Sequence, residues 1–544
     1  DGRTAVYRSE RIEKNAFLQS LDNEEEEMEE KHSQQQRTCG VQTGTDEVGE
    51  GTSRTTTCTA AEKDRERAEV LEIGVQYWTD YAKWEFHHKS VLEVGGVWQT
   101  EPSSLAGFGD GRDLVRSAEM LEAINDRIRF FVEECDHLQG FQAIVDDSGG
   151  FAAVAADVLS EIADDYGRSP CLLFSVRPPV AAGGSISASQ RSISEINNSL
   201  SYGVLSGLAT CYVPMGRKEF MPQGSELGSG QGYFPHIVVN EAKPYHTSAL
   251  YAAAIEACTL PWRLRREGSA LAAEGPLGCT DLHSIVNMLH LRARMNIAAA
   301  AIAFPTSAIS GPNAQASLMK AEKERMDEKC VHMTSQLKWL TEGMSDDRIS
   351  SSLSSSASTA LATVSGRPFS EMNVLRGARV SDPATGGYVT ASVGDANAAL
   401  CDSLSKEQRP MIMRHIVVAQ QPLALPLPFP RLFRPYVTEH GDIEGAAAHQ
   451  GRSFEPWRLK GGADVTSAPI LARLSATAAI LPALETAQDK LGPSSSRTGV
   501  ADVLEKWGFS RVEVEEIRER LSDLVVGYGG GEGDEGDFMD FEDD

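Results

Sequence analysis

The sequence is short of positive charge. Its 544 residues include 51 Lys and Arg against 78 Asp and Glu, which gives a formal net charge of -27. A general nucleic-acid binder needs basic patches that neutralise phosphates, so this balance argues against a nucleic-acid partner. Much of the negative charge is concentrated in Asp22–Glu30 and in residues 531–544. Such runs are typical of solvated acidic segments.

Paired cysteines and long apolar runs are also missing. The nine cysteines are scattered singly, without a Cys-x-x-Cys pair, which suits a reducing compartment and predicts no zinc framework. The apolar run Ile297–Pro305 is too short to cross a bilayer. Arg473 and Glu485 interrupt the longer segment Ala468–Ala487. We therefore expect no transmembrane segment.

The N-terminal part of the chain has little that could fold. Residues 1–22 contain one segment with an ordered composition, Ala5–Leu21, whereas residues 23–69 are acidic and rich in Gln, Thr and Ser. Sequence of that composition cannot bury a core, so we expect a disordered insertion there. The chain starts at Asp1 and not at Met, and we interpret it as a fragment.

A regular alternation of elements begins near residue 114. Apolar residues recur at helical spacing over Leu114–Glu133, and Gly140–Val145 has the pattern of a buried strand. A turn with two glycines follows, then a predicted helix over Phe151–Tyr166 and a second predicted strand over Cys171–Val176. This order of strand, glycine turn, helix and strand is the unit of a parallel sheet with right-handed crossovers. The fold class is α/β.

The same pattern extends along the chain and sets the predicted domains. Further helices are expected over 193–208, Tyr245–Arg265, Asp281–Leu289, Pro469–Leu491 and Val500–Leu524, with strands over 209–214 and Met295–Phe304. We expect a first domain over 70–268, a second over 269–465, C-terminal helices over 466–526 and an acidic tail over 527–544. The second domain is expected to carry low-complexity insertions at 305–370 and 420–465, which include Ser345–Thr359 and the Pro-rich stretch Pro422–Pro435.

One sequence motif resembles a known family. Asn125–Gln142 is similar to the helix and strand that precede the glycine-rich phosphate loop of tubulins, and its Glu-Glu-Cys-Asp-x-Leu-Gln-Gly wording over 133–140 resembles the Misato family more than tubulin itself. Further segments are similar to tubulin or Misato sequences: Lys14–Asp22, Tyr77–Asp80, Asp147–Tyr166, Leu173–Pro178, Ser194–Val213, Lys243–Leu264 and Asp281–Pro305.

The resemblance implies a tubulin/FtsZ-like architecture. A parallel-sheet nucleotide-type domain would be followed by a smaller α/β activation-type domain and by C-terminal helices. The family's opening strand and first phosphate loop would precede Asp1.

The glycine turn is the first candidate site. Tubulins have three glycines followed by Thr-Gly-Ser-Gly there, and this chain has Asp147-Ser-Gly-Gly-Phe-Ala-Ala153. Ser148, Gly149 and Gly150 could form part of a phosphate cradle. Asp146 and Asp147 would place negative charge beside it, and Phe151–Ala153 replace small and polar residues. The alternative is an ordinary strand-to-helix turn with Ser148 or Asp147 as the N-cap.

The resemblance places guanine recognition at the start of the helix over Tyr245–Arg265. Tyr245 or His246 would stack on the base. The Asn expected four residues later falls at Ala249 or Leu250, which cannot bond a base edge, and Val213–Gly216 replaces an Asp-Asn-Glu run. A lost hydrogen bond at a buried site costs about 1–3 kcal/mol.

The hydrolytic pattern is also incomplete. Tubulin-type polymers use Asn-x-Asp-x-x-Glu on the loop before the activation domain, and the matching positions here keep Asp281 but have Ser284 in place of Glu. Serine cannot polarise an attacking water as a carboxylate does. Asp281 could equally be a helix cap. We therefore predict no catalytic residue and an inactive GTPase.

Three other sequence features give little indication of a functional site. The glycine cluster Gly228–Gly232 follows no strand and is interpreted as a loop. His87 and His88 have no partner at metal-ligand spacing, so no metal site is expected. Cys135 lies on the apolar side of a helix end, which favours buried packing.

The resemblance implies a non-catalytic protein that acts by binding in mitochondrial distribution, morphology and mitochondrial DNA inheritance. It would work in the cytoplasm or on the outer mitochondrial surface, with mitochondrial surface proteins as partners. Two alternatives stay open: an active, GTP-binding, filament-forming GTPase, and a factor that assembles tubulin or chaperonin. GTP is a possible ligand in these readings.

Overall fold

The structure is a computed structural model. It describes residues 16–24, 63, 66, 70–72, 75, 86–92, 94, 105–112, 114–179, 188–217, 220, 233–264, 275–290, 295–309, 333–344, 368–381, 387–407, 413–426, 429–443, 465–492 and 499–529. The sequence features Tyr77–Asp80, Gly228–Gly232 and Ser345–Thr359 lie outside the described residues, as does nearly all of the predicted insertion over 23–69.

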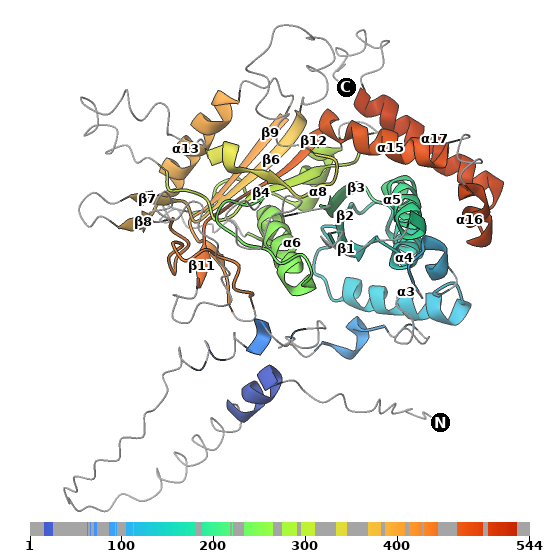
Figure 1. The fold of residues 1–544 in the computed structure, drawn as a ribbon, viewed down its shortest axis with the longest axis horizontal. Helices are drawn as coiled ribbons and strands as arrows, with labels where there is room; N and C mark the ends of the chain where they lie inside the picture. Colours follow the sequence, from blue (N-terminus) through green and yellow to red (C-terminus); the bar gives the residue numbers. More distant parts are fainter. Residues whose placement is uncertain are drawn as a thin grey trace, which may run out of the picture.

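A parallel sheet of three strands forms the first layer (Figure 1). Its order is β1-β2-β3, and both strand pairs are parallel, as the sequence predicted. Two helices make the crossovers, because their apolar faces pack back onto the sheet. The bounds are β1 Phe141–Asp146, α4 Phe151–Tyr166, β2 Cys171–Arg177, α5 Ala188–Leu208 and β3 Cys211–Gly216.

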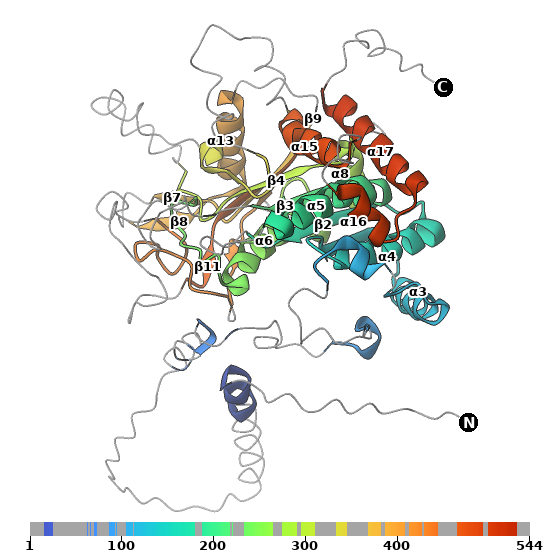
Figure 2. The ribbon, with the colours of Figure 1, turned by 45° about the vertical axis from the view of Figure 1, so that its right-hand side comes forward.

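Helices from the end of the chain complete the outer layer of this domain. Figures 1 and 2 both show the C-terminal helices (red) beside α4 and α5. Side chains of these helices share one apolar core with β2, β3 and α5, including Leu484, Leu521 and Tyr528. The bounds are α15 Leu481–Leu491, α16 Val500–Lys506 and α17 Arg511–Gly529, with α3 (Ala118–Glu133) at the opposite edge of the domain.

The second sheet has five strands in the order β5-β4-β12-β6-β9. Neighbouring strands are antiparallel except β6 and β9. The sheet continues from the first one, because Tyr212 of β3 pairs in parallel with Ile297, just before β4. The bounds are β4 Ala299–Ala303, β5 Lys338–Trp339, β6 Pro368–Arg376, β9 Met413–Ala419 and β12 Ile470–Thr477.

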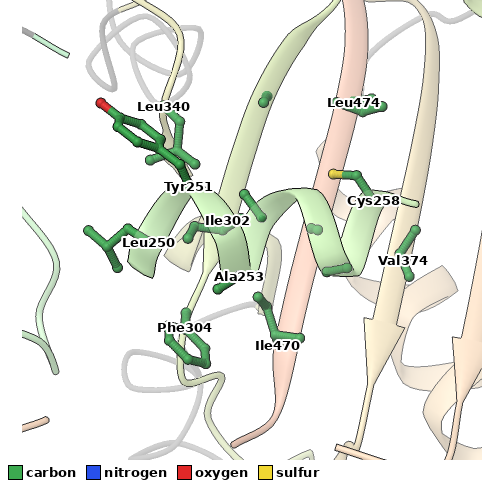
Figure 3. Packing of buried hydrophobic residues seen from close by; sticks show 14 of the residues in the cluster. Leu250, Tyr251, Ala253, Cys258, Ile302, Phe304, Leu340, Val374, Ile470 and Leu474 are labelled. Atoms are coloured by element: carbon green, nitrogen blue, oxygen red, sulfur yellow. The ribbon is translucent and has the colours of Figure 1, made fainter. Parts of the chain in front are cut away.

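Helices cover both faces of this sheet. On one face, α6 (Pro244–Cys258) places Ala253 and Cys258 against apolar residues of β4, β6 and β12 (Figure 3). On the other face, α13 (Val393–Lys406) buries Leu400 and Leu404. Burial on both faces explains the continuous apolar sequence of β4.

The remaining described elements are short. They are η2 His88–Ser90, η3 Phe108–Gly111, α7 Leu260–Arg263, α8 Leu282–Leu289, η4 Met333–Gln336, β7 Arg379–Ser381, β8 Tyr388–Thr390, β10 Leu423–Ala424, β11 Ser467–Ala468 and η7 Ala478–Ile480; residues 16–24 are also largely helical. No helix of the described residues is long and apolar enough to cross a membrane.

Two sequence predictions were wrong. The helix expected over Pro469–Leu491 begins only at Leu481, because Ile470–Thr477 is the central strand β12. Every residue of β12 is buried. Its stretch Ala472–Thr477 alternates apolar and polar residues, which is the period of a strand and was overlooked in the helix prediction. The Pro-rich stretch Pro422–Pro435 was expected to interrupt the domain. It contributes Leu423, Leu425, Leu432 and Phe433 to the core instead.

Candidate functional site

The turn between β1 and α4 is held by local side-chain bonds. The backbone N–H and the hydroxyl of Ser148 both donate to Oδ1 of Asp146, at 3.0 and 2.6 Å. The N-cap of α4 is Gly150, which has no side-chain capping bond. The predicted N-cap at Ser148 or Asp147 is therefore wrong, because Ser148 bonds backwards to Asp146 and Asp147 turns into the core.

Asp147 carries a buried negative charge that does not face the turn. Its side chain is fully buried, and Arg177 donates to both carboxylate oxygens, at 2.8 and 2.7 Å. The hydroxyl of Tyr212 donates to the same carboxylate at 2.8 Å. Burial alone would lower the pKa of Arg177, but the charge of Asp147 keeps that pKa well above its ordinary value. The predicted repulsion between Asp147 and an anion at the turn is therefore cancelled.

The two glycines of the turn lie directly against residues 105–112. The N–H of Gly150 donates to the carbonyl of Leu105 at 2.9 Å. A Cβ at Gly149 would collide with that carbonyl, and a Cβ at Gly150 would lie 2.8 Å from Cδ2 of Leu105 and 3.0 Å from the backbone N of Gly111. Glycine is needed here for the close approach of two backbones. The same amide that could bind phosphate is thus already bonded within the chain.

Asn197 of α5 joins the turn to this segment. Its side-chain amide donates to the carbonyls of Ala106 and Ser148, at 2.7 and 2.8 Å, and its oxygen accepts from the N–H of Phe108 at 2.9 Å. The residue is 1% exposed, so its side-chain amide needs hydrogen-bond partners within the protein, and these three backbone groups supply them. Nothing in the sequence marked Asn197 or residues 105–112 as partners of the turn.

The start of α6 is covered as well. His246 is fully buried, with Nε2 2.9 Å from Oε2 of Glu72. The N–H of Asn240 donates to its Nδ1 at 3.3 Å, so the proton of the neutral ring belongs on Nε2. Tyr245 packs with Phe17 and Leu71 in a small buried cluster. Both rings that were expected to meet a base therefore contact N-terminal residues of the same chain.

The carboxylate of Glu72 fixes the N-terminal residues over the start of α6. Besides His246, its carboxylate accepts from the backbone N–H of Arg431 at 2.7 Å and lies 3.8 Å from Nζ of Lys243. Burial would raise the pKa of Glu72, but the hydrogen bond from His246, with help from the backbone N–H of Arg431 and the charge of Lys243, brings the pKa below its ordinary value. Glu72 thus links the N-terminal segment to both domains.

The positions expected to read the guanine edge are core residues. Ala249 and Leu250 are 7% and 0% exposed and pack in the α6 core (Figure 3 shows Leu250). The stretch Val213–Gly216 ends β3, and all four of its residues are buried. Neither set offers a polar side chain at the start of α6.

The remnant of the hydrolytic motif works as a helix cap. Asp281 is the N-cap of α8, and Ser284 donates to its carboxylate through the backbone N–H at 2.8 Å and through the hydroxyl at 3.0 Å. The hydrogen bond from the backbone N–H of Ser284 is the main cause that lowers the pKa of Asp281. The alternative interpretation of Asp281 as a cap is confirmed, and Ser284 is the residue that it caps.

Two remaining candidates can be placed. Cys135 is exposed, not buried as predicted, because α3 ends at Glu133 and leaves the thiol outside. His87 is also exposed and stacks on Phe130, with ring centroids 5.4 Å apart. Within the described parts of the chain, no group of three or more His, Cys, Asp or Glu residues is placed to hold a metal ion.

The parallel β1–α4–β2–α5–β3 unit is consistent with a tubulin-like α/β fold, and residues 68–264 match the family described as "Tubulin domain". The chain is 29% identical over 205 residues to "Protein misato homolog 1" of Mus musculus, which covers 36% of this chain and 34% of that protein. It is 29% identical over 203 residues to "Protein misato" of Drosophila melanogaster, covering 37% and 35%.

It is also similar to "Protein DML1" of Gibberella zeae, at 28% identity over 240 residues that cover 43% of this chain and 45% of that protein. The resemblance to the Misato family is thereby confirmed. The chain spans about a third of the length of the animal relatives it matches.

Proposed function

We propose that this tubulin-like chain acts by binding and does not hydrolyse GTP, and that it takes part in mitochondrial distribution, morphology and mitochondrial DNA inheritance. The observation that carries the first half is the contact of Leu105–Arg112 with the glycine turn, where Gly150 donates to Leu105 and a Cβ would not fit. A phosphate needs the N–H groups and the space that this contact uses.

The hydrolytic position supports the same conclusion. Phosphoryl transfer to water needs a group that orients and polarises the nucleophile. At this position the chain has Ser284, whose hydroxyl already donates to Asp281. A serine hydroxyl lacks the basicity of a carboxylate, and the one hydrogen of Ser284 is already donated to Asp281.

The test is a GTPase assay of the purified chain beside tubulin at equal concentration and Mg²⁺. We expect release of phosphate at the rate of the buffer control, and a rate comparable to tubulin would refute the proposal. Gly149→Asp is the matched variant for binding, because its carboxylate would lie against any phosphate at the turn. GTP binding by the native chain that is lost in this variant would favour the rival, an active filament-forming GTPase that uses Gly149, Gly150 and Asp281.

The mitochondrial half rests on the family resemblance and is tested in cells. We expect the chain in the cytoplasm and on the outer mitochondrial surface, accessible to protease in intact mitochondria. Depletion should disturb mitochondrial distribution and the inheritance of mitochondrial DNA, and normal mitochondria after depletion would contradict this half. The partners would be mitochondrial surface proteins. Co-purification with tubulin or chaperonin and with no mitochondrial protein would favour an assembly factor instead.

A further inference from the structure

The side of segment 105–112 that faces away from the glycine turn is covered by C-terminal residues. A Cβ at Gly107 or at Gly109 would overlap the ring of Trp507, at the end of α16. The rings of Phe108 and Phe509 lie 5.8 Å apart between their centroids. The segment is therefore enclosed on two sides by groups that leave no room for a side chain at its glycines.

An ion pair fastens the same end of the segment. Arg112 is 7% exposed, its guanidinium donates to the carboxylate of Glu513 on α17, and it lies 4.1 Å from the centroid of the Phe509 ring. Glu513 also accepts from the N–H of Ser510 at 2.7 Å, and the hydroxyl of Ser510 accepts from the N–H of Glu513 at 3.2 Å. This reciprocal capping box fixes the start of α17 while the carboxylate holds Arg112.

Of the glycines at 107, 109 and 111, two contact the C-terminal residues and one contacts the glycine turn. The first two face Trp507, and the third faces the carbonyl of Gly150, which a Cβ at Gly111 would overlap. Both contacts fall within one short segment, whose centre is the 3-10 turn η3. The C-terminal helices and the glycine turn are therefore in contact with the same few residues from opposite sides.

We propose that Trp507, Phe509 and Glu513 form a latch that holds residues 105–112 on the Gly149–Gly150 turn. The latch keeps the N–H of Gly150 bonded to Leu105, so release of the C-terminal helices opens the turn. This inference shares one premise with the proposed function, namely that residues 105–112 cover the turn in the native chain. By linkage, any ligand that binds only the opened turn must loosen the contact at Trp507 by the same free energy.

The test is hydrogen exchange of the full chain, read by mass spectrometry in peptides that cover the turn (147–153) and β12 (470–477). Two variants release the latch from opposite sides. Glu513→Gln weakens the ion pair with Arg112 but keeps an acceptor for Ser510, and Gly109→Ala adds a methyl group that pushes the segment off Trp507. Val512→Ser is the control, because Val512 is 68% exposed on the same helix.

We expect exchange of the turn peptide to become at least tenfold faster in both release variants, with the β12 peptide unchanged and with no effect of Val512→Ser. An unchanged turn peptide in either release variant overturns the latch. An equal acceleration of the β12 peptide also overturns it, because the contact would then serve only global stability. A GTPase-active native chain would refute the proposed function without changing these exchange rates, so the two failures can be told apart.

Discussion

At the Gly149–Gly150 turn, backbone lies against backbone, whereas at the start of α6 the cover is made by side chains. The first contact needs the absence of Cβ atoms and a bond from the N–H of Gly150 to Leu105. The second needs the charge of Glu72 beside His246 and a small apolar cluster around Tyr245. A backbone contact has no rotamers to adjust and does not titrate. The side chains that cover the start of α6 can change rotamer, and the carboxylate of Glu72 among them titrates.

The difference has a practical meaning for the region that tubulins use for a nucleotide. Steric closure at the turn should respond to added volume and to the loss of the charges that fix it, but not to pH near neutrality. Closure at α6 should respond to ionisation. The following substitutions distinguish the contact at the Gly149–Gly150 turn from the contact at the start of α6. They are ordered from the largest expected effect to the smallest.

Asp147→Ala should cost the most. It leaves the guanidinium of Arg177 buried beside Tyr212 without its carboxylate, and removal of one partner of a buried pair typically costs about 3–5 kcal/mol. Chemical denaturation followed by circular dichroism measures the loss. Asp146→Ala is the control, since the carboxylate of Asp146 is exposed and accepts from Ser148, two residues further along the chain. This variant should cost below about 1 kcal/mol. Equal losses in the two variants would show that Asp147 is not the anchor of the turn.

Gly111→Ala should lower the free energy of unfolding by about 1–3 kcal/mol. The new methyl group would overlap the carbonyl of Gly150 in the turn, so one of the two backbones must move. Gly207→Ala is the matched control. Gly207 lies in α5 with nothing within 4 Å of its Cβ position, so the change should be neutral or stabilising by up to about 1 kcal/mol. Thermal unfolding compares the two, and a drop of Tm for both variants would contradict the steric account.

Glu72→Gln should weaken the α6 end by about 1–3 kcal/mol at pH 7, since His246 and Arg431 lose a charged acceptor. The pKa of Glu72 is lower in the folded chain than its ordinary value, so its contribution is present above about pH 4.3 and is lost as the pH falls through the folded pKa. Urea titrations at several pH values should therefore converge for native and variant at low pH. Glu119→Gln, at an exposed position of α3, is the matched control for the loss of one negative charge.

His236 gives the smallest expected effect, in the segment that leads to α6. Burial and the charge of Arg434 lower its pKa to about 4, so the unfolded chain binds more protons between about pH 6.5 and 4. Stability from this group is complete above about pH 6.5 and falls as the pH drops towards 4. His236→Gln should make that slope shallower by about 1–2 kcal/mol over the window, after allowance for partial exposure. His440→Gln, at an exposed position, is the matched control for the loss of one imidazole.

Local pattern was sufficient for much of the first domain. The predicted helix over Phe151–Tyr166 has the same bounds as α4, and the strand over Cys171–Val176 differs from β2 by one residue. Both elements are bordered by a glycine or a proline, where the backbone preference changes sharply. The strand β12 was missed although Ala472–Thr477 alternates apolar and polar residues, because its polar residues Arg473 and Ser475 are buried in the protein and the long apolar segment around them favoured a helix.

The partners of the candidate site were beyond the reach of the sequence. Ser148, Gly149 and Gly150 were found at the expected turn, but Asn197 meets Phe108 across 89 positions of the chain. The ion pair of Asp147 with Arg177 could have been suspected, because both residues end neighbouring strands of a parallel sheet. Contact of any of these residues with a nucleotide stays a prediction.

The position of β12 has a consequence for how the chain is made. This strand is translated last of the five in its sheet, yet it lies at the centre and pairs with both β4 and β6. While the ribosome is still synthesising residues before Ile470, β4 and β6 have no common partner and present open edges. The second sheet can therefore close only late in synthesis, and a chain stopped before Ile470 would keep two edges available for pairing with other chains.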